Sequence, residues 1–333
     1  MKKVFLTWMA FFVAIITADA QQIFNVQNGD RSMFYNDLET ALGEAVSGDT
    51  IYLPGGLIEW NPNELIIDKK LALIGVGADS IGAGTQITRI AKQIKFITGS
   101  DGSLITGCRI DNRVVIGEVG TGSVQDIMIF RNVTNDLYIG NGSYVTKRIT
   151  VIENVIRGNL RSNGPVATEC VVQNNLFPIN GAYYISTLKN SLIQNNIVRE
   201  IRSVESCTIS NNIITVNTSY PTSNCAYNNN AFLFAGLPSG ANNTFLDNLE
   251  NQSAATTFEN SAGVLPADVE ILSGSPCKDA GTDGTDIGIY GGSSPFKKGS
   301  VPANPHISKM IISNIADSNG KIKVDIEVSA QER

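Results

Sequence analysis

The sequence predicts an all-β protein built mainly as a right-handed parallel β-helix, with a short N-terminal capping helix and a C-terminal β-hairpin tail. The first observation is an internal repeat of about 20 residues with strand-like units, a period typical of stacked β-helices. Parallel strands joined by such connections are overwhelmingly right-handed, which sets the expected hand. Eight copies of the repeat begin at Cys108, Ile127, Ile149, Cys170, Ser191, Cys207, Cys225 and Asn243.

The second observation is a column of asparagines five positions into these copies. Asparagine tolerates the left-handed backbone region better than other non-glycine residues, so it suits a corner between two strands. Stacked corners let side-chain amides hydrogen-bond from coil to coil. Arg113 takes this place in the first copy, and an apolar residue follows in every copy. The predicted structural ladder consists of Asn132, Asn154, Asn175, Asn196, Asn212, Asn230 and Asn248.

The rival folds are an antiparallel β-sandwich and a β-propeller. Both would place hairpin turns such as Asn-Gly between alternating strands. The pairs Asn141-Gly142 and Asn163-Gly164 occur, but outside the register of the repeat. The β-helix is therefore the favoured prediction.

Residues 1–20 have the pattern of a secretory signal peptide. Met1-Lys2-Lys3 gives a basic start, residues 4–16 are apolar, and Ala18-Asp19-Ala20 matches a cleavage site. No later segment is long and apolar enough to span a bilayer, so no transmembrane segment is expected. The chain is predicted to be exported to the periplasm, the cell surface or the extracellular space.

The predicted β-helix region, residues 21–292, opens with a short helix. Asn36 is the expected N-cap, and Glu39 is placed to complete a capping box. Apolar residues at 38, 41, 42 and 45 then form one face, which suits a helix that covers the first coil. Predicted strands follow at residues 50–53, 65–67, 71–74, 87–90, 94–97 and 104–105.

The C-terminal end has a different composition. Residues 293–306 contain three prolines and are predicted to be a linker. Residues 307–316 and 321–330 flank a turn at Asp317–Gly320, so residues 307–333 are predicted to form a β-hairpin tail. Because a single hairpin is marginally stable in water, we expect it to pack on the β-helix or to bind a partner.

Three stretches carry a resemblance to a known family. They are DLETALGEAVSGDTIYLPGG, KKLALIGVGAD and the closing run SPCKDAGTDGTDIGIYGG, which ends at Gly292. They resemble segments of secreted proteins of the pectate-lyase-like (pectin lyase fold) superfamily, and the resemblance covers roughly residues 36–292. It implies a right-handed parallel β-helix. Lyases of this kind typically use Ca²⁺ held by Asp and Glu with an Arg or Lys base, and its glycosidases use Asp pairs with a His-containing motif.

The catalytic patterns implied by the resemblance are missing. The motifs Asn-Thr-Asp, Asp-Asp and Gly-His-Gly do not occur, and no repeat column carries stacked carboxylates. The single histidine, His306, argues against a multi-histidine metal site and a Ser-His-Asp triad. These absences favour a non-catalytic protein without a required cofactor.

Charge narrows the choice of partner. A net charge of -6 and a pI near 5.0 disfavour nucleic acid and anionic membranes. Dense anionic polysaccharides would also be disfavoured unless Ca²⁺ bridged them or basic residues clustered locally.

A local basic cluster is the first candidate ligand site. It is predicted from arginines that follow the asparagine corners and from tyrosines placed in the segments between coils. The cluster could bind an acidic sugar, or it could be a solvated surface without a ligand, and both interpretations stay open. The candidates are Arg157, Arg161, Arg199, Arg202, Tyr183 and Tyr184, with Tyr138 and Tyr220 as further aromatic residues.

Three aspartates form the second candidate. Asp279, Asp283 and Asp286 are separated by glycines and could supply the hard oxygen ligands that Ca²⁺ prefers. Asp and Gly also form tight turns without any metal, so a closing turn is the alternative.

The cysteines are expected to be small buried residues. Cys108, Cys170, Cys207 and Cys225 all fall in the first column of the repeat, two residues before an apolar or aromatic position that faces the core. Cys207 and Cys225 lie one coil apart, so a disulfide between them is the alternative.

Three functional hypotheses follow. The first is an exported, non-catalytic β-helix that binds a surface glycan, or a partner protein through the C-terminal hairpin. The second is a polysaccharide lyase or related enzyme acting on uronic-acid polymers, with the arginines neutralising uronate carboxylates. The third is an inert structural spacer.

Overall fold

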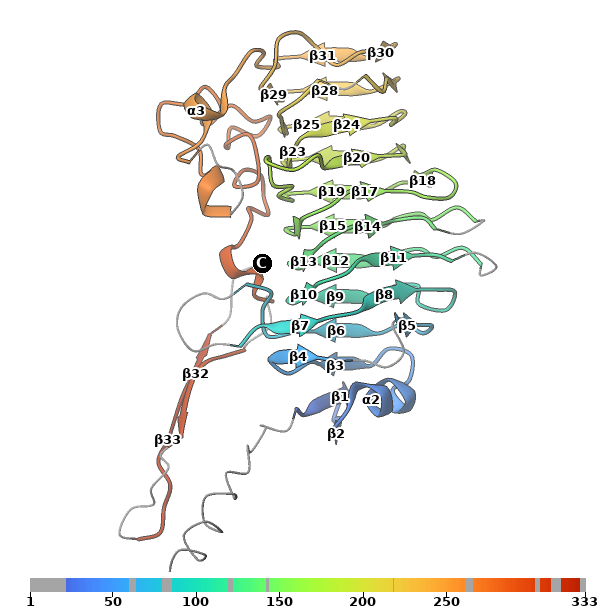
Figure 1. Cartoon of the computed structure of the whole chain (residues 1–333), viewed down its shortest axis with the longest axis vertical. Helices are drawn as coiled ribbons and strands as arrows, with labels where there is room; N and C mark the ends of the chain where they lie inside the picture. Colours follow the sequence, from blue (N-terminus) through green and yellow to red (C-terminus); the bar gives the residue numbers. More distant parts are fainter. Residues whose placement is uncertain are drawn as a thin grey trace, which may run out of the picture.

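The structure is a computed structural model that describes residues 22–59, 64–79, 86–118, 122–141, 144–217, 219–260, 266–302, 306–312 and 319–329. The predicted signal peptide lies outside these residues. The described chain forms a parallel β-solenoid of about nine turns, whose coils stack one above another in Figure 1.

Most turns up to β24 give one strand to each of three sheets, here named A, B and C, and the later turns give strands to sheets A and B. Sheet A begins with two antiparallel strands and continues with parallel ones. Its strands are β2 (Arg31–Tyr35), β1 (Phe24–Asn28), β3 (Thr50–Tyr52), β6 (Ala72–Ile74), β9 (Leu104–Thr106), β12 (Met128–Phe130), β15 (Thr150–Ile152), β19 (Val171–Gln173), β22 (Leu192–Gln194), β25 (Thr208–Ser210), β28 (Ala226–Asn228) and β31 (Thr244–Leu246).

Sheet B follows sheet A across the asparagine corner and is parallel throughout, with single bridges joining its two halves through Leu176. Its strands are β4 (Gly56–Ile58), β7 (Thr88–Ile90), β10 (Cys108–Ile110), β13 (Val133–Thr134), β16 (Val155–Ile156), β23 (Ile197–Val198), β26 (Ile213–Ile214) and β29 (Ala231–Phe232).

Sheet C completes the turn. Its parallel strands are β5 (Glu64–Ile67), β8 (Gln93–Phe96), β11 (Val114–Ile116), β14 (Leu137–Tyr138), β17 (Leu160–Arg161), β20 (Tyr184–Ser186) and β24 (Glu200–Arg202). Short pairs lie on the return to sheet A: β18 (Ala167–Thr168) with β21 (Leu188–Lys189), and β27 (Thr222–Ser223) with β30 (Gly240–Ala241).

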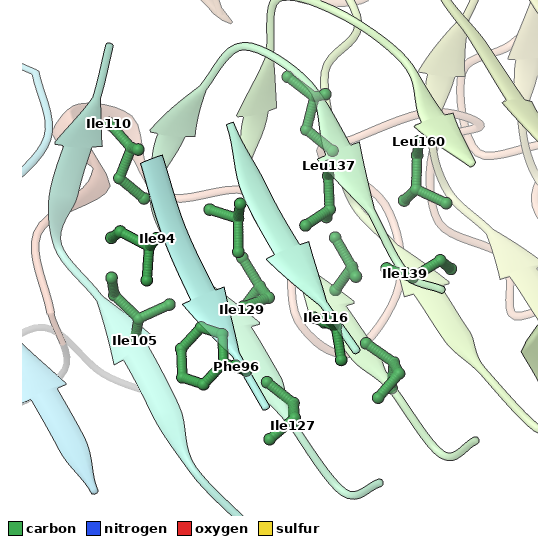
Figure 2. Close-up of a cluster of buried hydrophobic side chains, with 14 of the residues drawn as sticks. Ile94, Phe96, Ile105, Ile110, Ile116, Ile127, Ile129, Leu137, Ile139 and Leu160 are labelled. Atoms are coloured by element: carbon green, nitrogen blue, oxygen red, sulfur yellow. The ribbon is translucent and has the colours of Figure 1, made fainter. Parts of the chain in front are cut away.

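The core fills the inside of the coils. Strand residues alternate between the two faces of a sheet, and the inward positions stack as columns of isoleucine, leucine, valine and phenylalanine. Figure 2 shows such side chains from all three sheets meeting inside, with Ile105 and Ile129 from sheet A, Ile110 from sheet B, and Leu137 and Leu160 from sheet C.

The N-terminal end carries the helix α2 (Leu38–Glu44), whose Leu38, Ala41 and Leu42 are buried in the same core. The N-cap is Asp37 rather than the predicted Asn36. Its carboxylate accepts a hydrogen bond from the Thr40 backbone N–H at 2.7 Å. The helix thus begins one residue later than the capping-box prediction required.

The asparagine ladder is present, with an unexpected division of roles. The left-handed backbone belongs to the residue before each ladder asparagine, namely Arg131, Glu153, Asn174, Asn195, Asn211, Asn229 and Asp247. The ladder asparagine itself bonds to the next coil. Asn154, for example, donates from Nδ2 to Asn175 Oδ1 at 3.0 Å, and Asn175 repeats the bond to Asn196 at 2.9 Å.

The first predicted copy is out of register. Cys108 belongs to sheet B, and its backbone N–H donates to Asn132 Oδ1 at 3.0 Å, so Cys108 lies in the asparagine column. The strand of sheet A in that turn is β9, paired with β12 through Leu104↔Met128. Arg113 therefore does not belong to the ladder column, and Cys108 does not share the column of Cys170.

A C-terminal segment, described over residues 254–260 and 266–302, covers the outer face of sheet B (Figure 1). It contains α3 (Ala254–Thr257) and the 3₁₀ helices η1 (Pro266–Val269) and η2 (Lys298–Ser300). Its apolar side chains form a second core cluster with outward residues of sheet B. That cluster includes Val133, Val155, Leu176, Ile197, Ile213, Ala231, Phe258, Val269, Cys277, Ile287, Ile289 and Phe296.

Polar contacts join the same segment to the left-handed column. Asn174 Nδ2 donates to the carbonyls of Ile289 and Gly291 at 2.8 Å each. Nearer the N-terminal end, the fully buried Arg131 donates to the Val301 carbonyl at 3.2 Å. The first ten residues of the predicted linker thus include residues packed against the solenoid.

Beyond this segment, β32 (His306–Ile312) and β33 (Val324–Ser329) pair antiparallel. Figure 1 shows them extending away from the stacked coils. The hairpin prediction is confirmed for these residues, while the central turn lies partly outside the described chain.

Candidate functional site: an arginine–tyrosine stack on sheet C

The outer face of sheet C carries charged and aromatic side chains. Leu137, Leu160, Ile185 and Ile201 form its inward column. Residues next to that column point outward because side chains alternate along a strand. Tyr138 and Arg161 are paired neighbours in this outward position.

Arginines and tyrosines alternate on this face from coil to coil. Each contacts the next through the ring face or through the phenol oxygen. We call this set the Arg–Tyr stack; its members are Arg113, Tyr138, Arg161, Tyr184, Arg202 and Tyr220.

The centre of the stack is held by hydrogen bonds from Arg161. Its Nη2 donates to Tyr138 Oη at 3.1 Å and its Nη1 donates to Tyr184 Oη at 3.2 Å. The Arg161 guanidinium carbon also lies 4.8 Å from the centre of the Tyr138 ring, within cation–π range. One guanidinium thus joins tyrosines from the coil before and the coil after.

Cation–π contacts extend the stack in both directions. The Arg113 guanidinium carbon lies 5.3 Å from the centre of the Tyr138 ring. The Arg202 guanidinium carbon lies 3.3 Å from the Tyr184 ring centre and 4.6 Å from that of Tyr220. Tyr138 is buried, the next three members of the stack are half-buried, and Arg113 and Tyr220 at its ends are exposed.

The positive charge of Arg113 and Arg161 is not matched by a nearby carboxylate. Within the described part of the chain, neither guanidinium lies within ion-pair distance of an Asp or Glu. Burial lowers the pKa of Arg161, but its hydrogen bonds to Tyr138 and Tyr184 outweigh that effect and raise the pKa. The guanidinium stays charged, and its buried Nε has no hydrogen-bond partner among the described residues.

Ion pairs mark the two ends of this face. Lys95 lies 2.7 Å from Glu64 and 2.6 Å from Glu118. At the other end, Glu200 lies 3.5 Å from both Arg199 and Arg202. The least compensated positive charge therefore lies between these ends, at Arg113 and Arg161.

This arrangement presents hydrogen-bond donors. Because the hydroxyls of Tyr138 and Tyr184 accept from Arg161, their own O–H hydrogens are directed elsewhere. Guanidinium and phenol donors together suit carboxylate or sulfate oxygens. The exposed ring of Tyr220 can pack against the apolar face of a sugar. The coils repeat at about 4.8 Å, so the donors form a linear series.

The structure brings only some of the predicted site residues together. Arg161, Arg202 and Tyr184 join in the stack. Arg157 and Arg199 lie just before sheet C in corners two coils apart, as the bridges through Leu176 show. They make no ring contact with the stack tyrosines.

The tyrosines are placed differently from the prediction. Tyr138 and Tyr184 lie on strands of sheet C, not in loops, because each turn contains a third strand that the repeat pattern did not define. Tyr183 packs against the main core instead of facing outward, as expected for the immediate neighbour of Tyr184 in an extended segment. Tyr184, next to it, lies on the outer face and is half-buried.

Arg113 is the stack member that sequence reasoning assigned elsewhere. The repeat pattern predicted a ladder position for Arg113, but the residue directly precedes β11 on sheet C. Its place on sheet C becomes visible only once the register of the first copy is corrected.

The three aspartates stabilise turns. Asp286 accepts from the Asp279 backbone N–H at 3.0 Å and pairs with Lys278 at 3.0 Å. Asp283 accepts from the Thr285 backbone and hydroxyl at 3.1 and 2.7 Å. Among the residues that the structure describes, no group of three or more His, Cys, Asp or Glu side chains is placed to hold a metal ion.

Comparisons with models of known families, with curated proteins and with solved structures found no match. The helices of the described residues are all too short or too polar to cross a membrane.

Proposed function

We propose that this chain is an exported, non-catalytic, right-handed β-helix protein of the pectate-lyase-like superfamily that binds an extended acidic glycan along the Arg–Tyr stack. The observation that carries the proposal is the alternation of guanidinium and phenol groups, with contacts running from Arg113 to Tyr220. The sequence resemblance supports export and family. The proposed function does not depend on metal or on the histidine.

The chemistry favours an acidic ligand over a neutral one. Arg113 and Arg161 offer charge without a described carboxylate partner in a protein that is acidic as a whole. An acidic chain can still bind a polyanion where its basic residues cluster locally, and these arginines form such a cluster. A repeating ligand can place successive carboxylate or sulfate groups along the coil axis, so weak contacts add together.

A glycan array carrying uronic-acid, sulfated and neutral polymers tests the proposal. The mature chain is expected to bind acidic polymers, with affinity that falls as salt screens the arginines. Arg161→Met should weaken binding tenfold or more, because each charge-assisted hydrogen bond contributes about 1.5–3 kcal/mol.

Arg148→Gln is the matched control. Arg148 is a half-exposed arginine paired with Asp126 at 2.7 Å on the return segment to sheet A. Equal losses from both substitutions would refute the assignment of the stack, and a blank array would favour an inert spacer. Absorbance from unsaturated products during incubation with uronic-acid polymers would instead identify a lyase.

The C-terminal hairpin supports a second, separate role in binding a partner protein. Its strands β32 and β33 pair with each other and extend from the stacked coils, and Ile322 and Val324 beside and in β33 are exposed. A partner could extend this two-stranded sheet by adding a strand. Deleting residues 307–333 should abolish co-purification of that partner and leave glycan binding intact.

A further inference from the structure

Two cysteines are stacked in neighbouring coils near the C-terminal end of the solenoid. Cys207 directly precedes β25 and Cys225 directly precedes β28, and these strands pair through Thr208↔Ala226. Neighbouring strands lie about 4.8 Å apart. That spacing falls inside the range of about 4.4–6.8 Å between Cα atoms joined by a disulfide.

Their side chains face the same interior space. The exposed fractions are 2% for Cys207 and 1% for Cys225, and each thiol donates to a backbone carbonyl just before it, Cys207 to Glu205 at 3.3 Å and Cys225 to Ser223 at 3.2 Å. Their contact with each other lowers the pKa of Cys225, against the effect of burial, and raises the pKa of Cys207.

The other three cysteines have different surroundings. Cys170 has Ser191 as its neighbour in the next coil, and Cys108 lies beside Asn132 in the asparagine column. Cys277 is buried in the second core cluster. Among the described residues, Cys207 and Cys225 are the two cysteines that occupy the same column in neighbouring coils.

We propose that Cys207 and Cys225 form an intrachain disulfide when the protein folds in the presence of a small-molecule disulfide oxidant. One of the two cysteines, as its thiolate, attacks one sulfur of the oxidant, forms a mixed disulfide and releases one thiol. The other cysteine then loses its proton and attacks the sulfur of the first, releasing the second thiol. Two protein thiols are oxidised and one oxidant disulfide is reduced to two thiols.

The position gives the bond a structural purpose. Only one further strand of sheet A, β31, follows the coil of Cys225, and its Leu246 is 60% exposed. Terminal repeats of a solenoid have a neighbour on one side only and therefore open most readily. A bond between the coils of Cys207 and Cys225 resists that opening by closing an 18-residue step of the chain.

The test is refolding of the full mature chain with a mixture of oxidised and reduced glutathione, followed by alkylation and intact mass measurement. We expect a loss of two hydrogens, three alkylated cysteines, and fragmentation spectra that locate the unlabelled pair at Cys207 and Cys225. The oxidised form should melt at a higher temperature than the reduced form. Refolding gives the oxidant access to thiols that are buried in the native state.

Two variants make the result specific. Cys225→Ser should leave four alkylated cysteines and remove the difference in melting temperature, whereas Cys170→Ser should keep the disulfide. If Cys225→Ser does not fold, the positions of the alkyl groups in the wild-type chain decide the question. Five alkylated cysteines after oxidative refolding, or a bond between any other pair, would overturn the proposal.

Discussion

Replacing Asn175 by alanine isolates the contribution of one rung of the asparagine ladder. Its Nδ2 donates to the carbonyls of Val151 and Gln173 at 2.8 and 2.9 Å, and to Asn196 Oδ1 at 2.9 Å. Its Oδ1 accepts from the backbone and side-chain N–H groups of Asn154 at 3.0 Å each. All of these groups lie at a corner closed to solvent.

The expected cost follows from what the substitution leaves behind. The buried backbone N–H of Asn154 loses its acceptor, which costs about 1–3 kcal/mol. The remaining bonds contribute about 0.5–1.5 kcal/mol each, but removal of the amide also ends the need to bury it. We expect Asn175→Ala to lower the free energy of unfolding by about 2–4 kcal/mol.

Urea denaturation followed by circular dichroism measures this change. Asn248→Ala, at the less buried end of the ladder, should cost about 1 kcal/mol because water can reach the freed Asn230 N–H. Asn163→Ala, in an exposed loop, is the control and should change stability by less than about 0.5 kcal/mol. A cost for Asn175→Ala no larger than that of Asn163→Ala would refute the reasoning. Glycan binding by the folded fraction should be unchanged.

Two further predictions concern the C-terminal segment. In the native chain the fully buried Arg131 lies 2.8 Å from Glu153. Glu153→Gln removes this charge partner and should lower the free energy of unfolding in urea by about 3–5 kcal/mol. The double variant with Arg131→Met should cost less than the sum of the single changes, and strict additivity would contradict direct coupling. Gly291→Ala should expose residues 280–302 to proteases, because the new Cβ would overlap the Asp286 carbonyl oxygen. Gly274→Ala is the control and should not change cleavage, because Gly274 has open space around it. Equal cleavage of the two variants would contradict this contact.

The repeat was predictable because the ladder imposes a sequence signature. An amide that both donates and accepts along the coil axis can be supplied by asparagine at one position per turn, and the position appears seven times. The register of the first copy was predicted wrongly for the same reason. The turn at Cys108 ends the ladder with a backbone donor, so it carries no asparagine and the pattern could not fix its register.

The candidate site was only partly predictable. Arg161, Arg202 and Tyr184 were chosen for their residue types, but their mutual contacts depend on the length of each return to sheet C. That length varies between turns, as the longer path from Leu176 to Tyr184 shows. Tyr183 and Tyr184 have the same side chain, so residue type cannot tell which of them faces outward. Only the strand register places one inward and the other outward.

The sequence by itself determined the architecture: a periodic column of asparagines and apolar residues can be satisfied by stacked parallel coils and by few other folds. Tertiary structure decided how distant segments use that stack. It placed residues 280–302 along the left-handed column and aligned arginines with tyrosines across sheet C. The reason is physical. Local pattern fixes which face a residue occupies within its own coil, whereas contacts between coils depend on registers set by loops whose lengths carry no periodic signal.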